Sequence, residues 1–163
     1  MTVVSNTSPI LNLACIGELR LLEALYGRVL IPPQVRSEIE RLKETEPRFR
    51  DVSLPSFVQV VEEINRVRIE ALTLDLDPGE AAAISLALDL RSELILLDER
   101  RGRATARRLG LSPFGLLGVL IEARQKGVLP ALKPALAKLE VDAGFWLSDE
   151  LKRQALVAVD ERP

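Results

Sequence analysis

Short aliphatic runs alternate along most of the chain with longer segments in which apolar residues recur every three or four positions. Short runs bounded by turn residues are typical of buried parallel strands, and the longer periodicity is typical of amphipathic helices. The pattern predicts strands over residues 2–6, 28–31, 57–61 and 94–98, with residues 111–114 leading into a further helix. It predicts helices over residues 9–16, 18–26, 33–43, 65–72, 77–90, 99–109, 116–126 and 130–139, and a last helix capped by Ser148.

Turn and cap residues mark where these elements begin and end. Ser8 is predicted to cap the first helix, because Pro9 suits the first helical position. Residues 44–56 carry charges and two prolines, which predicts a surface loop. No repeat or linker divides the chain. The alternation of strands and helices predicts a single α/β domain over residues 1–163, a three-layer α/β/α sandwich with a central parallel sheet and a helical C-terminal third.

Composition narrows the class of protein. With 163 residues, 47% of them hydrophobic and 28% charged, the chain can bury a sizeable core. No apolar run approaches the length of a membrane span, and the N-terminus lacks the pattern of a secretion signal. We therefore expect a cytoplasmic protein with no membrane association. The single cysteine, Cys15, excludes an internal disulfide, and its apolar surroundings in the sequence predict a buried structural thiol.

The chain contains no histidine. This absence excludes Ser-His-Asp and Cys-His nucleophilic systems, histidine general bases and most zinc sites. Any chemistry must therefore use carboxylates, amides, hydroxyls, lysine or arginine, with or without a metal that prefers oxygen ligands.

Oxygen-bearing side chains fall where strands are predicted to end. Asp98 and Glu99 directly follow the aliphatic run 94–97, and Asn6 is the last residue of the first predicted strand. Ligands of open α/β sheets bind just beyond the carboxyl ends of strands. With further carboxylates from the helices, these residues predict a site for a hard divalent cation.

Each acid also has a structural interpretation. Asp77 and Glu80 flank a proline and a glycine in the order expected of a helix N-terminal capping box. Asp98 is the strongest site candidate, with capping of the helix that follows it as the alternative, and Glu99 suits the first turn of that helix. Glu38 lies at the edge of an amphipathic helix, where a solvated carboxylate is common. From the residues alone, both interpretations stay open.

Five segments together resemble the PIN-domain nucleases, in the subgroup of uncharacterised domains close to VapC-type ribonuclease toxins. They are Val4–Ile10 (VSNTSPI), Ile31–Ile39 (IPPQVRSEI), Leu76–Ile84 (LDPGEAAAI), Leu97–Arg103 (LDERRGR) and Gly144–Ser148 (GFWLS). The resemblance implies a parallel sheet flanked by helices, an acidic pocket that holds Mg²⁺ or Mn²⁺, and cleavage of RNA. It also suggests a toxin restrained by a small cognate antitoxin protein. We further expect a homodimer, with Phe145 and Trp146 as core or dimer-interface anchors.

Carried over by position, the resemblance assigns catalytic and metal-binding roles to Glu38, Glu80 and Asp98, with Glu99 as a possible further ligand. The first acid of the family pattern falls on Asn6. An amide oxygen can bind Mg²⁺, but it brings no negative charge and accepts no proton. A site with three carboxylates and an amide should therefore hold divalent cations weakly.

A basic cluster follows the Asp98 carboxylate directly. The RNA contacts expected from this segment are Arg100, Arg101, Arg103 and Arg107, with Arg108 beside them and Ser8 as a further contact. Three of the arginines share one helix face and would hold phosphates next to the scissile bond. The alternative is a solvated helix face whose arginines pair with nearby acids. Few aromatic residues are present, so base stacking on an aromatic platform is not expected.

Two other functions stay open from the sequence. The first is a non-catalytic PIN-like protein that binds RNA or a partner and has lost turnover through Asn6. The second is a phosphoacceptor receiver domain, which also gathers acids at strand ends. The receiver is disfavoured because no pair of acids ends the first strand.

Overall fold

The computed structural model describes all 163 residues and contains one five-stranded, wholly parallel sheet. Its strands lie in the order β3-β2-β1-β4-β5, so β1 is central and is paired with β2 on one side and β4 on the other. The strands are β1 (Val3–Ser5), β2 (Val29–Ile31), β3 (Val58–Val60), β4 (Leu94–Leu96) and β5 (Pro113–Phe114). The predicted parallel sheet is confirmed.

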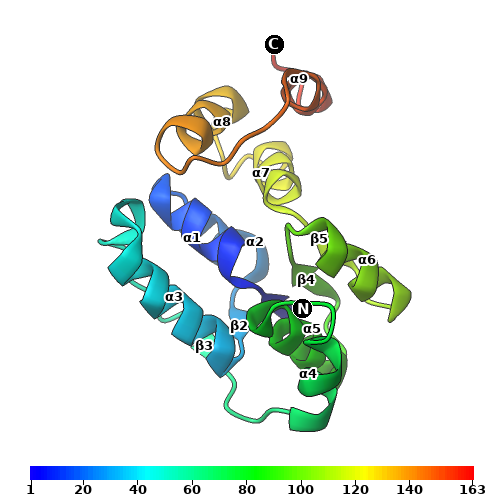
Figure 1. Ribbon diagram of the computed structural model, residues 1–163. Helices are drawn as coiled ribbons and strands as arrows, with labels where there is room; N and C mark the ends of the chain where they lie inside the picture. Colours follow the sequence, from blue (N-terminus) through cyan, green and yellow to red (C-terminus); the bar gives the residue numbers. More distant parts are fainter.

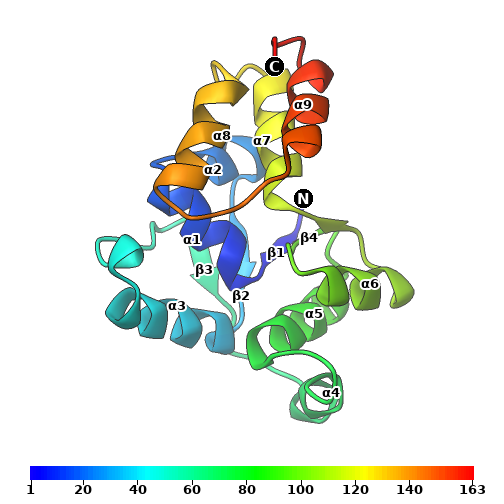
Figure 2. The same ribbon diagram turned by 45° about the horizontal axis from the view of Figure 1, so that its top comes forward.

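The chain has nine α-helices, of which α4 and α5 lie on one side of the sheet and α1, α2 and α7 on the other (Figures 1 and 2). The predicted three-layer α/β/α sandwich is therefore confirmed. The helices are α1 (Thr7–Cys15), α2 (Arg20–Tyr26), α3 (Pro33–Thr45), α4 (Arg66–Leu72), α5 (Pro78–Leu90), α6 (Arg100–Arg108), α7 (Leu116–Gln125), α8 (Leu132–Val141) and α9 (Asp149–Ala158). None of these helices combines the length and apolar composition needed to cross a bilayer.

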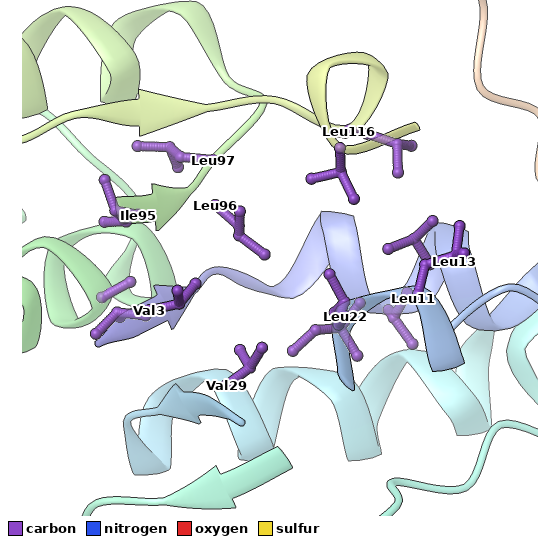
Figure 3. Close-up of a cluster of buried hydrophobic side chains, with 14 of the residues drawn as sticks. Val3, Leu11, Leu13, Leu22, Val29, Ile95, Leu96, Leu97 and Leu116 are labelled. Atoms are coloured by element: carbon purple, nitrogen blue, oxygen red, sulfur yellow. The ribbon is translucent and has the colours of Figure 1, made fainter. Parts of the chain in front are cut away.

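A single continuous cluster of buried apolar side chains joins the sheet to its helices. Figure 3 shows part of this cluster, with Val3 of β1 and Ile95 of β4 on the left, Leu11 and Leu22 from the first two helices on the right, and Leu96 of β4 between them. All five side chains have at most 1% of their surface exposed. Strands buried on both faces are expected to be aliphatic throughout, and this explains the short unbroken apolar runs in the sequence.

The helical C-terminal third forms its own layer at one end of the sheet. α7 packs against α2, and α8 and α9 pack against α7 (Figure 2). This arrangement leaves the carboxyl ends of β1 and β4 close to the start of α7, where Leu116 is fully buried in the core. The sequence predicts that this third covers one face of the sheet or forms an interface. In the structure α7 packs on α2 at one face of the sheet, while α8 and α9 pack on α7.

Three local predictions are wrong. Ser8 lies inside α1, which begins at Thr7 with Asn6 at the N-cap position, so Ser8 does not cap the helix. Residues 44–56 are not wholly a loop, because α3 runs to Thr45 and a 3₁₀ turn, η1 (Pro47–Phe49), follows it with Phe49 buried. Cys15 is only partly buried, with Sγ 3.3 Å from the carbonyl oxygen of Asp142.

Candidate active site

The chain adds β2 and β3 on one side of β1 and then β4 and β5 on its other side, so the strand order reverses at β1. This topological switch point brings Asn6 and Asp98 to the same edge of the sheet. β1 and β4 are parallel neighbours with Ser5 opposite Leu96. The backbone N–H of Asn6 continues the pairing by donating to the carbonyl of Leu96 at 2.9 Å. In open α/β sheets the crevice outside the carboxyl ends at such a point is the usual ligand site. Asn6 and Asp98, which lie just beyond the ends of β1 and β4, are therefore well placed to form one site.

The Asp98 carboxylate is held in one orientation. Its Oδ1 accepts a 2.8 Å hydrogen bond from the backbone N–H of Leu116, in the first turn of α7, and its Oδ2 accepts a longer one, 3.4 Å, from the Ser8 hydroxyl. Asp98 thus caps α7, whereas the sequence suggested the helix directly after it as the capping alternative. A carboxylate has about four lone-pair positions, so these two bonds leave acceptor capacity for a further ligand.

A second group of oxygens gathers around Gly79, at the start of α5. A Cβ at this glycine would lie 2.8 Å from Oε2 of Glu38 and 3.3 Å from Oδ1 of Asn6. Both oxygens therefore face the small space that the missing side chain leaves. Asn6 is 5% exposed and its Oδ1 has no hydrogen-bond partner. An unpaired buried amide oxygen costs free energy, and it is the kind of atom that a cation or water satisfies.

Glu80 has two roles in the structure. The predicted capping box is confirmed, since Oδ1 of Asp77 accepts from the Glu80 N–H at 2.8 Å and Oε2 of Glu80 accepts from the Asp77 N–H at 3.3 Å. The other oxygen, Oε1, is buried without a partner. A Cβ on Gly102 of α6 would lie 3.0 Å from this atom. The capping and ligand interpretations are therefore compatible, because the two oxygens of one carboxylate serve different partners.

All three candidate acids have raised pKa values. Burial raises the pKa of Glu38, of Glu80 and of Asp98, and for Glu80 burial and the neighbouring Asp77 charge bring the pKa to about 7. The Leu116 N–H and the Arg103 guanidinium oppose part of this shift at Asp98. Desolvated carboxylates that repel each other favour either protonation or a bound cation. When its carboxylates are ionised, the site therefore carries negative charge that a bound cation would neutralise.

The donor set fits a hard divalent cation. Carboxylate and amide oxygens are the ligands preferred by Mg²⁺ and Mn²⁺, and two of them, on Asn6 and Glu80, are buried and unsatisfied. No three of the chain's Asp, Glu and Cys side chains are close enough together to form a ready-made ion cluster. The structure instead has Glu38 beside Asn6, Glu80 against α6, and Asp98 at the start of α7. Metal binding would require these side chains to draw together.

Glu99 and the arginines lie at the rim. Glu99 is exposed and occupies the N-cap position of α6, without a side-chain capping bond. Arg100 and Arg107 are exposed, while Arg103 is half-buried and donates to the Leu97 carbonyl at 3.1 Å. The five arginines of α6 form no salt bridge with any acid, so the acid pairing of the alternative is absent, although four of the five are exposed as a solvated face requires.

The sequence reasoning missed two neighbours of the site. Asp77 was interpreted only as a cap, yet its charge raises the pKa of both Glu38 and Glu80. Thr7 is buried, and its hydroxyl lowers the pKa of Glu38. The signal for Thr7 was its place directly after Asn6 at the strand end. Its contact with a helix that begins 26 residues later depends on tertiary packing.

Comparison with known families gives one match that covers nearly the whole chain. Residues 2–161 match the family model DUF3368, which is described as a PIN domain. No curated protein shows significant similarity to the chain. A receiver domain is excluded as an alternative, because the strand order differs from the 2-1-3-4-5 order of receivers. The sheet order, the oxygen ligands beyond β1 and β4, and this match agree: the chain belongs to the PIN-domain family.

Proposed function

We propose that this protein is a metal-dependent endoribonuclease that hydrolyses RNA phosphodiester bonds with Mg²⁺ or Mn²⁺. The observation that carries the proposal is the pair of buried, unpartnered oxygens on Asn6 and Glu80 beside Glu38, at the carboxyl edge of the central strands. Membership of the PIN-domain family supports a nuclease in general. The residues proposed to hold the metal are Asn6, Glu38, Glu80 and Asp98.

The residues of the chain would have separate roles in the reaction. Asn6, Glu38, Glu80 and Asp98 would hold a divalent ion, whose positive charge would stabilise the phosphate in the transition state and lower the pKa of an attacking water. Asp98, fixed by the Leu116 N–H, keeps one ligand orientation before substrate arrives. Arg103 lies beside Asp98, since a Cβ on Gly115 would be 2.7 Å from its Nη1 and 3.1 Å from Oδ1 of Asp98. This guanidinium can hold a phosphate oxygen at the site.

The test is a cleavage assay on labelled single-stranded RNA with Mg²⁺, Mn²⁺ or EDTA. The parent should cleave only with metal, and Asp98→Asn should abolish cleavage while Asp51→Asn, an exposed acid remote in sequence from the site, should not. A single-stranded DNA of the same base sequence separates ribonuclease from general nuclease activity. Equal cleavage by Asp98→Asn and the parent would reject the proposed site.

We also propose, from the VapC-like resemblance, that the enzyme is the toxin of a toxin–antitoxin pair and acts as a homodimer. Expression of the chain alone should then arrest growth, and co-expression with the product of a short adjacent gene should relieve the arrest. Sedimentation tests the dimer. Normal growth with active protein present would contradict the toxin role without affecting the nuclease proposal.

A non-catalytic RNA- or partner-binding role is the second candidate, and Asn6 favours it. The amide contributes no charge where an additional carboxylate would strengthen a cation site. Under this alternative the parent binds RNA but does not cleave it with either metal, whereas Asn6→Asp gains cleavage. Cleavage by the parent protein would remove this candidate.

A further inference from the structure

A mostly apolar hollow of about 450 Å³ opens directly beside Asp98. Its walls include Phe114 at the end of β5, Leu117 of α7, and Phe145 and Trp146 from the segment between α8 and α9. Arg103 lies at the same end as Asp98. The hollow therefore combines one guanidinium and one carboxylate with an aromatic wall, within the range of about 300–1,000 Å³ usual for small-ligand pockets.

Trp146 is the least expected feature of this wall. It is the chain's single tryptophan, and 80% of its surface is exposed, so the predicted role as a core anchor is wrong for this residue. It also borders a second hollow of about 330 Å³ that contains Glu140 and Lys152. Trp146 thus lines two depressions and is largely exposed to solvent.

The backbone on either side of Trp146 is fixed. The N–H of Phe145 donates to the Leu139 carbonyl at 2.8 Å, and Leu147 is buried at 6% exposure. Two residues further, the Ser148 hydroxyl caps α9 by accepting from the Leu151 N–H at 3.1 Å. The indole is therefore presented by an anchored segment, which lowers the entropy lost when a ligand stacks on it.

The charges beside the hollow match a nucleic acid better than a protein surface. Asp98 is the only acid among the lining residues, and Arg103 stands next to it. From there the unpaired cationic face of α6 continues outward to Arg107, one helical turn away. A nucleotide places an apolar, flat base one sugar away from a phosphate. The hollow has the same arrangement, with an apolar wall that could contact the base and the Arg103 guanidinium that could contact the phosphate.

We infer that this hollow is a nucleobase pocket, in which a base of single-stranded RNA stacks on Trp146 while the adjoining phosphate lies at Arg103. This inference rests on the proposed function and extends it, because it names the recognition element next to the scissile phosphate. Aromatic stacking accepts any base, so the pocket gives affinity and register on the strand, with little sequence preference.

The sole tryptophan provides a direct reporter. The intact protein is titrated in EDTA, which prevents cleavage, with a short single-stranded RNA and with an abasic ribose-phosphate oligomer of the same length. Stacking of a base on the indole should quench Trp146 fluorescence with RNA, over the concentration range in which the anisotropy of labelled RNA rises. The abasic oligomer should cause no quenching. Full anisotropy change without quenching by RNA would overturn the inference.

Variants give an independent measurement by anisotropy alone. Trp146→Ala should weaken RNA binding by about 5- to 150-fold, the range for loss of one base–aromatic stack, and Trp146→Phe should keep most of the affinity. Val141→Ala is the matched control, because this apolar side chain is 81% exposed but lies outside the hollow. Parental affinity in Trp146→Ala would overturn the inference.

These measurements distinguish failure of the nucleobase-pocket inference from failure of the nuclease proposal. If Trp146→Ala still binds and cleaves RNA as the parent does, the pocket is wrong and the nuclease stands. If the parent never cleaves RNA but Trp146 is quenched by it, the pocket stands and catalysis is wrong. If Trp146→Ala changes only the sedimentation of the protein, the indole serves contact between two copies of the chain, and the inference is overturned.

Discussion

Asp98 accepts a 2.8 Å hydrogen bond from the backbone N–H of Leu116, so the proposed metal ligand after β4 is also the cap of α7. One carboxylate thus joins the central sheet to the helical C-terminal layer. The contact places negative charge at a helix N-terminus, where the macrodipole stabilises it. Structure and proposed chemistry therefore share this residue, and the two contributions can be separated by substitution.

The first prediction separates them with two variants. Asp98→Asn keeps an oxygen for the Leu116 N–H, so unfolding stability in EDTA should stay near that of the parent. Asp98→Ala removes the cap and should cost about 1 kcal/mol or more, within the usual range for cap loss. Both variants should lose Mn²⁺ binding by calorimetry, whereas Asp51→Asn should bind as the parent. Retained Mn²⁺ binding in Asp98→Asn would show that the acid serves only as a cap.

The second prediction concerns Asn6. Asn6→Asp adds a charge at a position that is 5% exposed and lies beside Glu38, so the melting temperature in EDTA should fall. In Mg²⁺ or Mn²⁺ the same variant should bind metal more tightly than the parent and cleave RNA faster. Metal-dependent stabilisation follows the ratio of metal concentration to dissociation constant, so thermal shift across a metal series measures it. An unchanged metal response would exclude Asn6 from the site.

The third prediction is a pH dependence caused by Glu80. Its pKa is raised from 4.5 to about 7, so between these values the native protein holds a proton that the unfolded chain has released. The contribution of Glu80 to the free energy of unfolding in EDTA should therefore be largest below pH 4.5. It should fall as the pH rises to 7. The loss should be about 3 kcal/mol.

The matched variant for this effect is Glu80→Gln, which has no proton to release and keeps an oxygen for the Asp77 N–H. Urea unfolding in EDTA should show no corresponding fall in its stability between pH 4.5 and 7. Above pH 7 the variant should be more stable than the parent. Parallel stability curves for the two proteins would contradict a raised pKa at Glu80.

The fourth prediction tests the arginine face of α6. Arg100→Ala with Arg107→Ala removes two exposed cations that are in no salt bridge, and it leaves Arg103 bonded to the Leu97 carbonyl. RNA affinity should fall, and the slope of log affinity against log salt should decrease by roughly 1.4, the value for two contacts to single-stranded phosphates. Mn²⁺ binding should be unchanged.

The control for this prediction is a second double variant, Arg28→Ala with Arg66→Ala. It removes the same net charge from exposed positions that are also unpaired. Gel shifts in Ca²⁺ at several salt concentrations compare the two. If both double variants change the salt slope equally, α6 provides only bulk charge and no specific phosphate contact.

Periodicity was sufficient to predict most elements of the fold, because buried strands and amphipathic helices are local patterns. All nine helices and four of the five strands lie at or within a few residues of the predicted segments, while β5 falls in residues 111–114, which were predicted only to lead into a helix. The errors come from non-local contacts. The charges and prolines of the segment after α3 predict a loop, yet Phe49 and Val52 are buried against the rest of the chain.

The candidate site also has some features that the sequence determines and others that depend on the tertiary structure. The sequence by itself determined which side chains end the central strands, that no histidine chemistry is available, and that Asp77 and Glu80 form a capping box, because each depends on residue identity and short spacing. Only the tertiary structure decided that Asp98 caps α7 instead of α6 and that Asn6 and Glu38 share the space beside Gly79. It also decided that the exposed Trp146 lines the same hollow as Asp98. These relationships join segments far apart in the chain, and their geometry is set by how the helices pack on the sheet.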